Sequence, residues 1–389
     1  MQKFLIICFL STLFLGCNSE QSEQNNTEAV PISFDFKNNK QNIHSTGLIK
    51  DVEVISLSND VLVGEVDKIC SYNNYLYLLD ADSYSVYVYD NLGNFMNNIH
   101  DYGRAGNQYS QLVDILIDKK EKNLKLISRL DRKLISYSLN GSDLLKVDKL
   151  PATFSNLSQT KNGFVGFAGN YIEDSNSKNV LTMNSDLTIE NGFFDIDKAF
   201  DSYGTSSITP FSEYQGTVFF TKMMDYNIYS INDNAAGVAY SFDFGEQSWP
   251  KEINSLAKMD GMSNAEKSKY IREIEIFQET DDFLIIKVVY QGETLLGIYD
   301  KKNKGSKVVT LDPYADKYFI SFGTIIGIDE NAIYTLVDAL NMKRFITGKD
   351  EYNNFEETYP EQIKRLRNKF SHLKIDEQSN PFLVTYSLK

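Results

Sequence analysis

Apolar and polar positions alternate in short runs over residues 74–141, and turn residues separate the runs. When Asn74–Gly93, "NYLYLLDADSYSVYVYDNLG", is placed above Lys122–Gly141, "KNLKLISRLDRKLISYSLNG", the two segments align without a gap at an offset of 48 residues. Leu76 then falls on Leu124. Each unit contains an alternating run, a polar turn, a second alternating run and an Asn/Gly turn. This pattern is typical of consecutive antiparallel strands.

Weaker copies of this unit recur along the chain, at Asn162–Asp186, Gly216–Asp233, Asp282–Gly305 and Asn331–Ala339. With flanking strands added, we expect six units of four strands, starting near residues 66, 111, 153, 206, 272 and 319. A spacing of roughly 40–50 residues with four strands per unit indicates the blades of a β-propeller. The alternative is an irregular sandwich of many strands, which would give no fixed offset. We therefore predict an all-β, six-bladed β-propeller.

The sixth unit lacks a fourth strand. It supplies Tyr318–Ile326, Asn331–Val337 and, after a long interruption, the final segment "NPFLVTYSLK". An isolated strand, Asp51–Leu57, precedes the first unit and could occupy the vacancy. Because joining both chain ends in one blade removes an exposed sheet edge, we expect the ring to close in this way.

The first residues are typical of an export signal. In "MQKFLIICFLSTLFLGC", one Lys precedes an apolar run that is too short to span a membrane. Gly16 before Cys17 resembles the lipobox of bacterial lipoproteins, which implies lipidation at Cys17; the alternative is an ordinary signal with an incidental cysteine. We predict a signal peptide over residues 1–16, a lipidated Cys17 with a disordered tether over 17–47, and the propeller over 48–389.

The loop "YGRAGNQY", followed by a strand, resembles the connector of NHL-like and TolB-like six-bladed propellers. Over residues 48–389 the chain is similar to six-bladed propeller lipoproteins of Gram-negative bacteria, through its lipobox, its "YLYLLD…VYVYDNLG" blade text and its C-terminal strand. The resemblance implies a cell-envelope protein held at the outer membrane by its lipid, either periplasmic or surface-exposed. These motifs specify the fold better than any chemistry.

The glycines of this loop raise the question of phosphate binding. A dinucleotide-binding loop opens a helix, whose N-terminus faces the pyrophosphate. Here Gly103 and Gly106 precede "LVDILID", an alternating strand. We therefore interpret the loop as a tight crossing between two blades.

Antiparallel topology places the connectors between blades on the same face as the turns between second and third strands. We name this the connector face, and we expect recognition there because loops on a rigid scaffold commonly carry function. The candidate ligand-binding residues on it are Asp80, Asp82, Tyr102, Arg104, Arg129, Asp131, Arg132, Asp174, Asp225 and Glu293.

Two long insertions are expected on that face, at about residues 245–270 and 338–380. The first contains Ser263 and Glu266 at the spacing of a capping box. The second places Pro360 in the first turn of a helix. An apolar stripe follows, comprising Ile363, Leu366, Phe370 and Leu373. This helix either packs onto the propeller or serves as a lid or docking helix.

Composition limits the chemistry. The net charge of −14 argues against nucleic acid as a partner. The three histidines, His44, His100 and His372, show no zinc-binding spacing. No catalytic or metal-binding residue is assigned and no cofactor is expected, although the many Asp and Asn residues in turns leave calcium open. Cys70 is interpreted as a buried small apolar residue, so the mature domain has no internal disulfide.

Two functions remain open. The first is a non-catalytic binding or scaffold module, monomeric and lipid-anchored, whose partner is an envelope protein, a peptide or a glycan. The second is a hydrolase or lyase that uses carboxylates, or calcium, at the mouth of the propeller channel.

Overall fold

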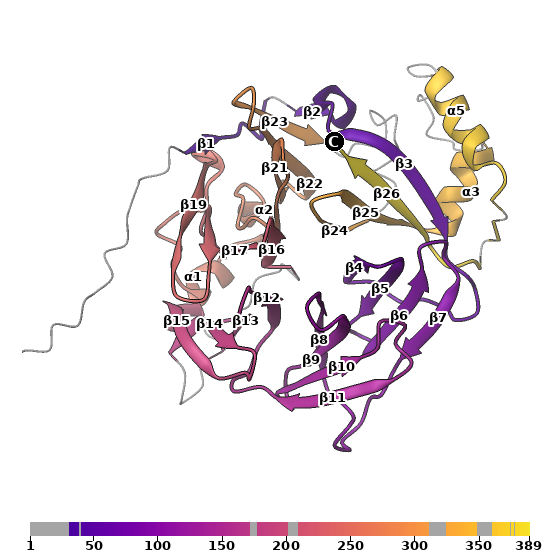
Figure 1. The fold of residues 1–389 in the computed structure, drawn as a ribbon. Coiled ribbons are helices and arrows are strands. Elements are labelled where there is room, and N and C mark those ends of the chain that lie inside the picture. Colours follow the sequence, from indigo (N-terminus) through magenta and orange to yellow (C-terminus); the bar gives the residue numbers. More distant parts are fainter. Residues whose placement is uncertain are drawn as a thin grey trace, which may run out of the picture.

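Six antiparallel sheets surround a central axis in the computed structural model, which describes residues 31–38, 40–171, 177–200, 209–310, 324–347, 360–373, 375–376 and 378–389. Figure 1 looks along the axis, with the innermost strand of each blade nearest the centre. The prediction of a six-bladed β-propeller is confirmed.

The first three blades follow the repeat closely. Blade one contains β4 (Lys68–Tyr72), β5 (Tyr75–Asp80), β6 (Ser85–Asp90) and β7 (Phe95–Ile99). Blade two contains β8 (Leu112–Asp118), β9 (Asn123–Ser128), β10 (Lys133–Tyr137) and β11 (Leu144–Lys149). Blade three contains β12 (Asn156–Gln159), β13 (Gly163–Phe167), β14 (Lys178–Asn184) and β15 (Ile189–Asp195), followed by the short helix η2 (Lys198–Phe200).

Blades four and five each carry a fifth strand. Blade four contains β16 (Phe211–Tyr214), β17 (Thr217–Thr221), β18 (Asn227–Ile231) and β19 (Ala236–Asp243), and β1 (Ile32–Ser33) adds to its outer edge. Blade five contains β20 (Ile276–Glu279), β21 (Phe283–Tyr290), β22 (Glu293–Asp300) and β23 (Gly305–Thr310), with β2 (Lys40–Asn42) at its outer edge. Both added strands run parallel to their neighbours.

The last blade joins the two ends of the chain. It contains β24 (Thr324–Ile328), β25 (Ala332–Val337), β26 (Phe382–Leu388) and β3 (Ile49–Ser56), in that order outward. The β3–β26 register runs from Ser56 opposite Phe382 to Ile49 opposite Leu388. The predicted closure by the early strand is confirmed. Of the strand expected at Tyr318–Ile326, residues 318–323 lie outside the described ranges.

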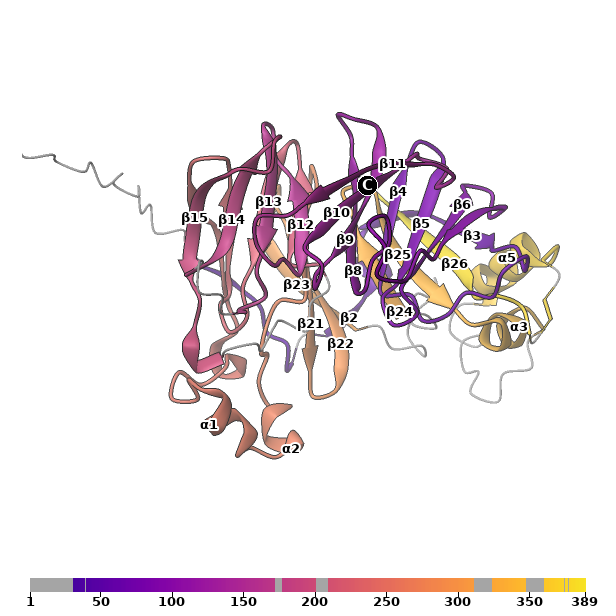
Figure 2. The ribbon, with the colours of Figure 1, turned by 90° about the horizontal axis from the view of Figure 1, so that it is seen from below.

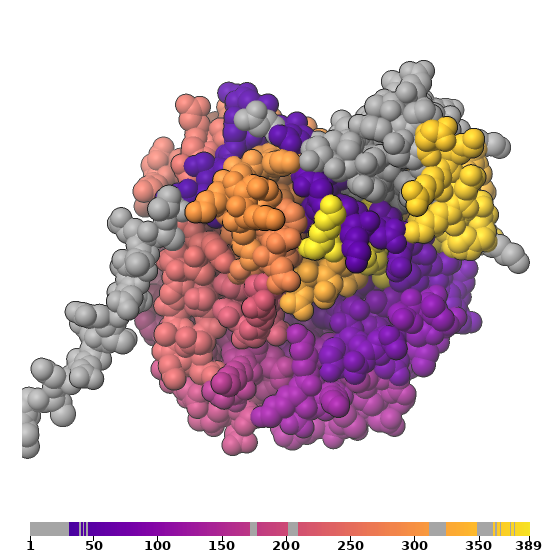
Figure 3. All heavy atoms as spheres, turned by 45° about the horizontal axis from the view of Figure 1, so that its top comes forward, coloured from indigo at the N-terminus to yellow at the C-terminus, as the bar shows by residue number. Residues whose placement is uncertain are grey.

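The predicted disordered tether ends earlier than residue 47. Besides β1 and β2, the helix η1 (Ile43–Thr46) belongs to the propeller. Phe34 and Phe36 are buried and pack with Phe242 and Phe244 at centroid distances of 5.8 and 5.4 Å respectively. Figure 3 shows this indigo segment against the orange chain of blade five. Residues 31–38 and 40–47 are therefore an ordered outer belt, and the predictions for residues 1–30, Cys17 included, lie outside the described residues.

The first insertion forms η3 (Gly245–Gln247), α1 (Leu256–Asp260) and α2 (Asn264–Lys267). The capping box of Ser263 and Glu266 is present as predicted. Figure 2 shows α1 and α2 projecting from one face of the ring, on the same side as the tip of the β21–β22 hairpin. That side is the connector face. No membrane-spanning helix is found among the described residues.

The second insertion forms α3 (Ala339–Thr347) and α5 (Pro360–Phe370). The helix begins at Pro360, as predicted. Phe370 is buried with Phe345 and Val52, and Leu373 packs against the same cluster. At these two positions the apolar stripe therefore packs onto the propeller. The side chains of Ile363 and Leu366 lie outside the described residues. Because Lys369 donates to the carbonyl of Val52 at 2.6 Å, the helices lie against the outer strand of blade six rather than over the channel.

The packing of the belt gives the first prediction. Replacing Phe36 by Ala should lower the free energy of unfolding by about 3–5 kcal/mol, because this fully buried ring leaves a cavity between the belt and blade four. Lys37→Ala, at the exposed neighbouring position, should change it by less than about 0.5 kcal/mol. Urea unfolding of both variants measures the difference, and equal stabilities would show that the belt contributes nothing to the fold.

Candidate functional site

Several of the candidates on the connector face support the turns and connectors of that face. The carboxylate of Asp80 accepts the N–H of Ser83 at 2.8 Å, and that of Asp225 accepts the N–H of Asn227 at 3.0 Å and the hydroxyl of Tyr229 at 2.6 Å. Asp131 accepts the N–H of Ser110 at 2.7 Å. These carboxylates hold backbone donors, as Asp commonly does in turns.

The pKa of Asp131 reflects this role. Burial acts to raise it, but hydrogen bonds from Ser110 and Ser128 outweigh burial and leave the pKa of this carboxyl lowered. The carboxylate is therefore charged at neutral pH, and it binds the connector before β8 to the turn after β9.

The remaining candidates do not converge on one point. Arg129 lies over the ring of Tyr171 at 4.8 Å and donates to its hydroxyl at 3.0 Å. Tyr102 stacks on Tyr84 at 5.1 Å between centroids. Asp82 and Arg104 are exposed, and Arg132 is half-buried in a turn at φ 50°. Glu293 pairs with Lys40 of the belt, and Asp174 lies outside the described residues.

The loop Tyr102–Tyr109, "YGRAGNQY", closes on itself. Gly103 donates its N–H to the carbonyl of Tyr109 at 2.9 Å, and the N–H of Ala105 is bound by the side chain of Gln108 at 3.0 Å. Since β8 follows directly, this is a blade-to-blade crossing, as the sequence indicates.

A cavity of about 450 Å³ occupies the channel, and all six innermost strands line it. Its wall includes the polar side chains Lys68, Ser71, Asp114, Lys119, Asn156, Ser158, Gln159, Ser212, Glu213, Gln278, Asp329, Glu330 and Asn331. At one end Ser71, Lys119 and Asn331 are exposed, whereas Asp114 and Asn156 at the other end are buried. The cavity therefore opens at the face of the first-to-second-strand turns, which we name the hairpin face, opposite the connector face.

A buried ion pair lies at the connector-face end of the cavity. The ammonium of Lys68 in β4 is 2.7 Å from Asp114 Oδ1 in β8, and Asp114 Oδ2 accepts the N–H of Leu157 in β12 at 3.0 Å. Asp114 is fully buried. The pair therefore connects the first three blades across the channel wall.

Each partner of the pair favours the charged form of the other. Burial alone would lower the pKa of Lys68, but the neighbouring Asp114 carboxylate raises the pKa above its ordinary value. Burial also raises the pKa of Asp114, and the Lys68 ammonium opposes that rise.

The open end carries a second, exposed pair. Lys119, after β8, lies 3.1 Å from both carboxylate oxygens of Glu213 in β16, which joins blade two to blade four. The Lys119 N–H is bound by Gln159 of blade three at 3.0 Å. Three blades therefore meet through side chains at the mouth.

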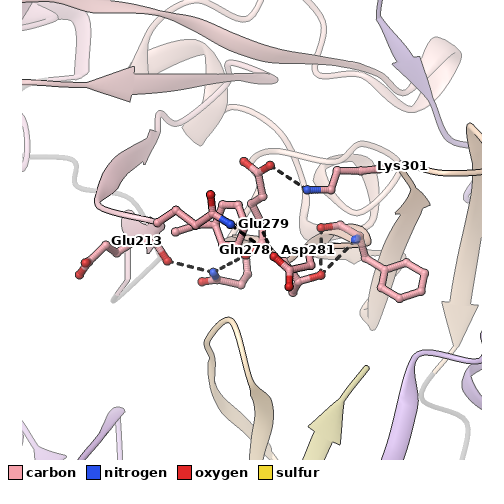
Figure 4. A network of polar contacts seen from close by, with 9 residues as sticks. Glu213, Gln278, Glu279, Asp281 and Lys301 are labelled. Atoms are coloured by element: carbon pink, nitrogen blue, oxygen red, sulfur yellow. Dashed lines mark hydrogen bonds and ion pairs between the residues drawn. The ribbon is translucent and has the colours of Figure 1, made fainter.

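Figure 4 shows the network between blades four and five beside this mouth. The buried Gln278 amide donates to the carbonyls of Glu213 at 3.1 Å and Glu279 at 2.8 Å. Lys301 pairs with Glu279 at 3.0 Å. Asp281, in the turn between β20 and β21, accepts the hydroxyl of Tyr214 at 2.6 Å. This hydrogen bond raises the pKa of Tyr214 to about 12. The mouth is thus held by contacts between neighbouring blades.

The reactive side chains of the cavity are held in protonated forms. Cys70 lines the wall and is half-buried, whereas the sequence predicts a buried residue, and burial raises its pKa to about 11. Burial, followed by the charge of Asp329, raises the pKa of Tyr334, whose hydroxyl donates to that carboxylate at 2.8 Å. Both groups are therefore hydrogen-bond donors at neutral pH. Within the described ranges, no group of three or more His, Cys, Asp or Glu residues is placed to hold a metal ion.

The candidate residues were taken from turns and connectors, whereas the cavity is lined mainly by innermost strands, so the cavity residues were not predicted. A signal was present in the innermost strands: Asp114 interrupts the apolar run of "LVDILID", and Lys68 stands in "KICSY". A charged residue inside a strand that packs at the centre of a ring indicates either a structural pair or a channel wall.

A family model for DUF4934, a domain of unknown function, matches residues 28–387. The chain belongs to the DUF4934 family. The match covers the belt and every blade, so the family is defined by the whole propeller.

Two solved structures share this fold. An exported protein from Bacteroides fragilis is 19% identical, with 92% of this chain and 100% of that chain covered at a TM-score of 0.72. A member of the duf4221 family from Bacteroides vulgatus is 9% identical, with coverages of 88% and 97% at a TM-score of 0.50. At these identities the likeness shows the fold alone. No curated protein matches the sequence.

The buried pair gives the second prediction. Lys68→Met should lower the free energy of unfolding by about 3–5 kcal/mol at neutral pH, because it leaves the Asp114 carboxylate buried without a counter-charge. Lys119→Met, which breaks the exposed pair at the mouth, should cost less than about 1 kcal/mol.

The pH dependence checks the cause. In Lys68→Met, burial keeps the folded-state pKa of Asp114 above the unfolded value, so the folded state binds more protons and stability is lost as pH rises through that window. Unfolding of the variant should therefore require more urea near pH 5 than near pH 7. A loss of stability that does not change with pH would assign the effect to packing instead.

Proposed function

We propose that this DUF4934 protein is a non-catalytic binding module of the cell envelope, and that its channel cavity holds a short extended segment of a peptide. The observation that carries the proposal is the cavity itself, about 450 Å³ in volume, with polar groups from all six blades on its wall. This volume is within the range of about 300–1,000 Å³ that is usual for ligand sites.

The character of the wall favours a peptide over a glycan. Each innermost strand pairs with only one neighbour in its sheet, so its other edge faces the channel. Such an edge can offer main-chain N–H and C=O groups to an extended chain. The amides of Asn156, Gln159 and Asn331 add donors and acceptors of the same kind.

The rigidity of the site also supports binding. The ion pair of Lys68 and Asp114, together with the Lys119–Glu213 and Gln278 contacts, holds the innermost strands in place. When the side chains and strands of a site are already ordered, ligand binding has a smaller entropy cost.

Export and anchoring are the second part of the proposal. The similarity to an exported protein supports export, and the segment "LFLGC" ending at Cys17 supports lipid attachment. With the tether leading to β1, the propeller would stand off the membrane from the edge of blade four. Mass spectrometry of the N-terminal peptide from membrane fractions, with and without Cys17→Ala, tests the lipid.

Blocking the mouth gives the third prediction. Ser71 is exposed on the innermost strand of blade one and lines the cavity, so Ser71→Trp places a bulky ring in the opening. Retention of a random tetrapeptide library on the immobilised protein should fall by roughly tenfold or more, because the ring excludes the ligand.

The matched control is Ser142→Trp, in an exposed turn at the outer side of blade two. It should retain the library at the wild-type level. Equal retention by both variants would remove the cavity as the peptide site. Turnover of a peptide by the wild-type protein, abolished by a chelator, would instead support the hydrolase alternative.

A further inference from the structure

A second pocket, of about 280 Å³, lies on the connector face between blades three and four. It is formed by the end of β13, the turns after β13 and β17, η2, and the start of the first insertion. Its apolar lining is supplied by Phe167, Phe200, Met223, Met224, Trp249, Pro250 and Ile253. It shares no lining residue with the channel cavity, so its ligand does not depend on the proposed peptide site.

The floor of this pocket is rigid. The Trp249 indole donates to the carbonyl of Ile253 at 3.0 Å, which fixes the ring against its own loop. Asn170 accepts the N–H of Asp197 at 2.8 Å and donates to its carbonyl at 2.9 Å, so η2 is attached to blade three. Two methionines complete the wall, and their unbranched side chains adapt to ligands of different shape.

The charged side chains of the pocket differ in whether their hydrogen-bonding atoms already have partners. The carboxylate of Asp225 is engaged by Asn227 and Tyr229, and that of Asp197 accepts the N–H of Ala199 at 2.9 Å. Lys222 and Lys251 also line the pocket, and neither forms an ion pair with a carboxylate in the described part of the chain. Among the described lining residues, the two ammonium groups are therefore the charged groups whose hydrogen-bonding capacity is available to a ligand.

We infer that this pocket binds a small amphipathic carboxylate, with its apolar body against Trp249 and the methionines and its anionic group toward Lys222 and Lys251. An aromatic body fits best, since Phe167, Phe200 and Trp249 offer three ring surfaces. The occupant is a small molecule, because the pocket, at about 280 Å³, is smaller than the channel cavity of about 450 Å³.

Trp249 makes the pocket directly observable, since it is the single tryptophan of the chain and lies in its wall. The experiment titrates the full chain with phenylbutyrate and, as a neutral match of similar size, phenylbutanol, and follows the indole fluorescence. Both should change the emission, and phenylbutyrate should bind roughly tenfold more tightly, because its carboxylate gains charge-assisted contacts.

Charge variants test the assignment of the anion site. The double variant Lys222→Met/Lys251→Met should abolish the preference for phenylbutyrate and leave phenylbutanol binding unchanged. Lys146→Met, on the exposed outer strand of blade two, is the matched control and should behave as wild type. Thermal melts establish that each variant is folded.

Three results would overturn the inference: no change of Trp249 emission with either probe, equal affinity for the two probes, or a preference that survives in the double variant. The first removes the pocket as a site, and the other two remove its choice of an anion. None of these results bears on the peptide library, so the two sites are judged separately.

Discussion

The pairing of β3 with β26 is the constraint on which the propeller depends. It joins residues from opposite ends of the chain in one sheet, with Val52 opposite Tyr386 and Val54 opposite Val384. Without it, blade six would end in an unpaired strand and the ring would remain open at one seam. The cluster that contains Val52, Val384 and Tyr386 also contains Phe370 of α5 and Ile43 of η1. Closure therefore orders the second insertion and the belt along with the last blade.

The channel cavity is a product of the same closure. Its wall takes residues from the first blade and from the last, among them Lys68 and Tyr334, and these two blades adjoin only in a closed ring. The buried pair of Lys68 and Asp114 then fixes the relative positions of blades one to three. Burial of a charge in such an interior costs desolvation, and it is tolerated at Asp114 because this carboxylate has Lys68 and the N–H of Leu157 as partners. The geometry of the site is thus a property of the whole molecule.

The blade repeat made most of the fold predictable. Alternation in Asn74–Gly93 and its copy gave the strands, their spacing gave the ring, and the vacancy in the sixth unit gave the closure. The belt was not predictable, because β1 and β2 have two and three residues and no period. Their places are set by the free outer edges of blades four and five and by the burial of Phe34 and Phe36, which are tertiary effects. Turn composition suggested a site on the connector face, where Asp80 and Asp225 bind donors of their own turns and Asp131 binds the connector before β8.

The belt has a mechanical consequence for any pull transmitted from the N-terminal side. The load reaches β1 first, and this strand holds blade four through a two-residue parallel register. β2 comes next, with three residues on blade five, and only then the long β3 seam. Tension would therefore detach β1 and then β2 before it reached the pairing of β3 with β26. Each detachment would lengthen the unfolded N-terminal segment while the ring stayed intact.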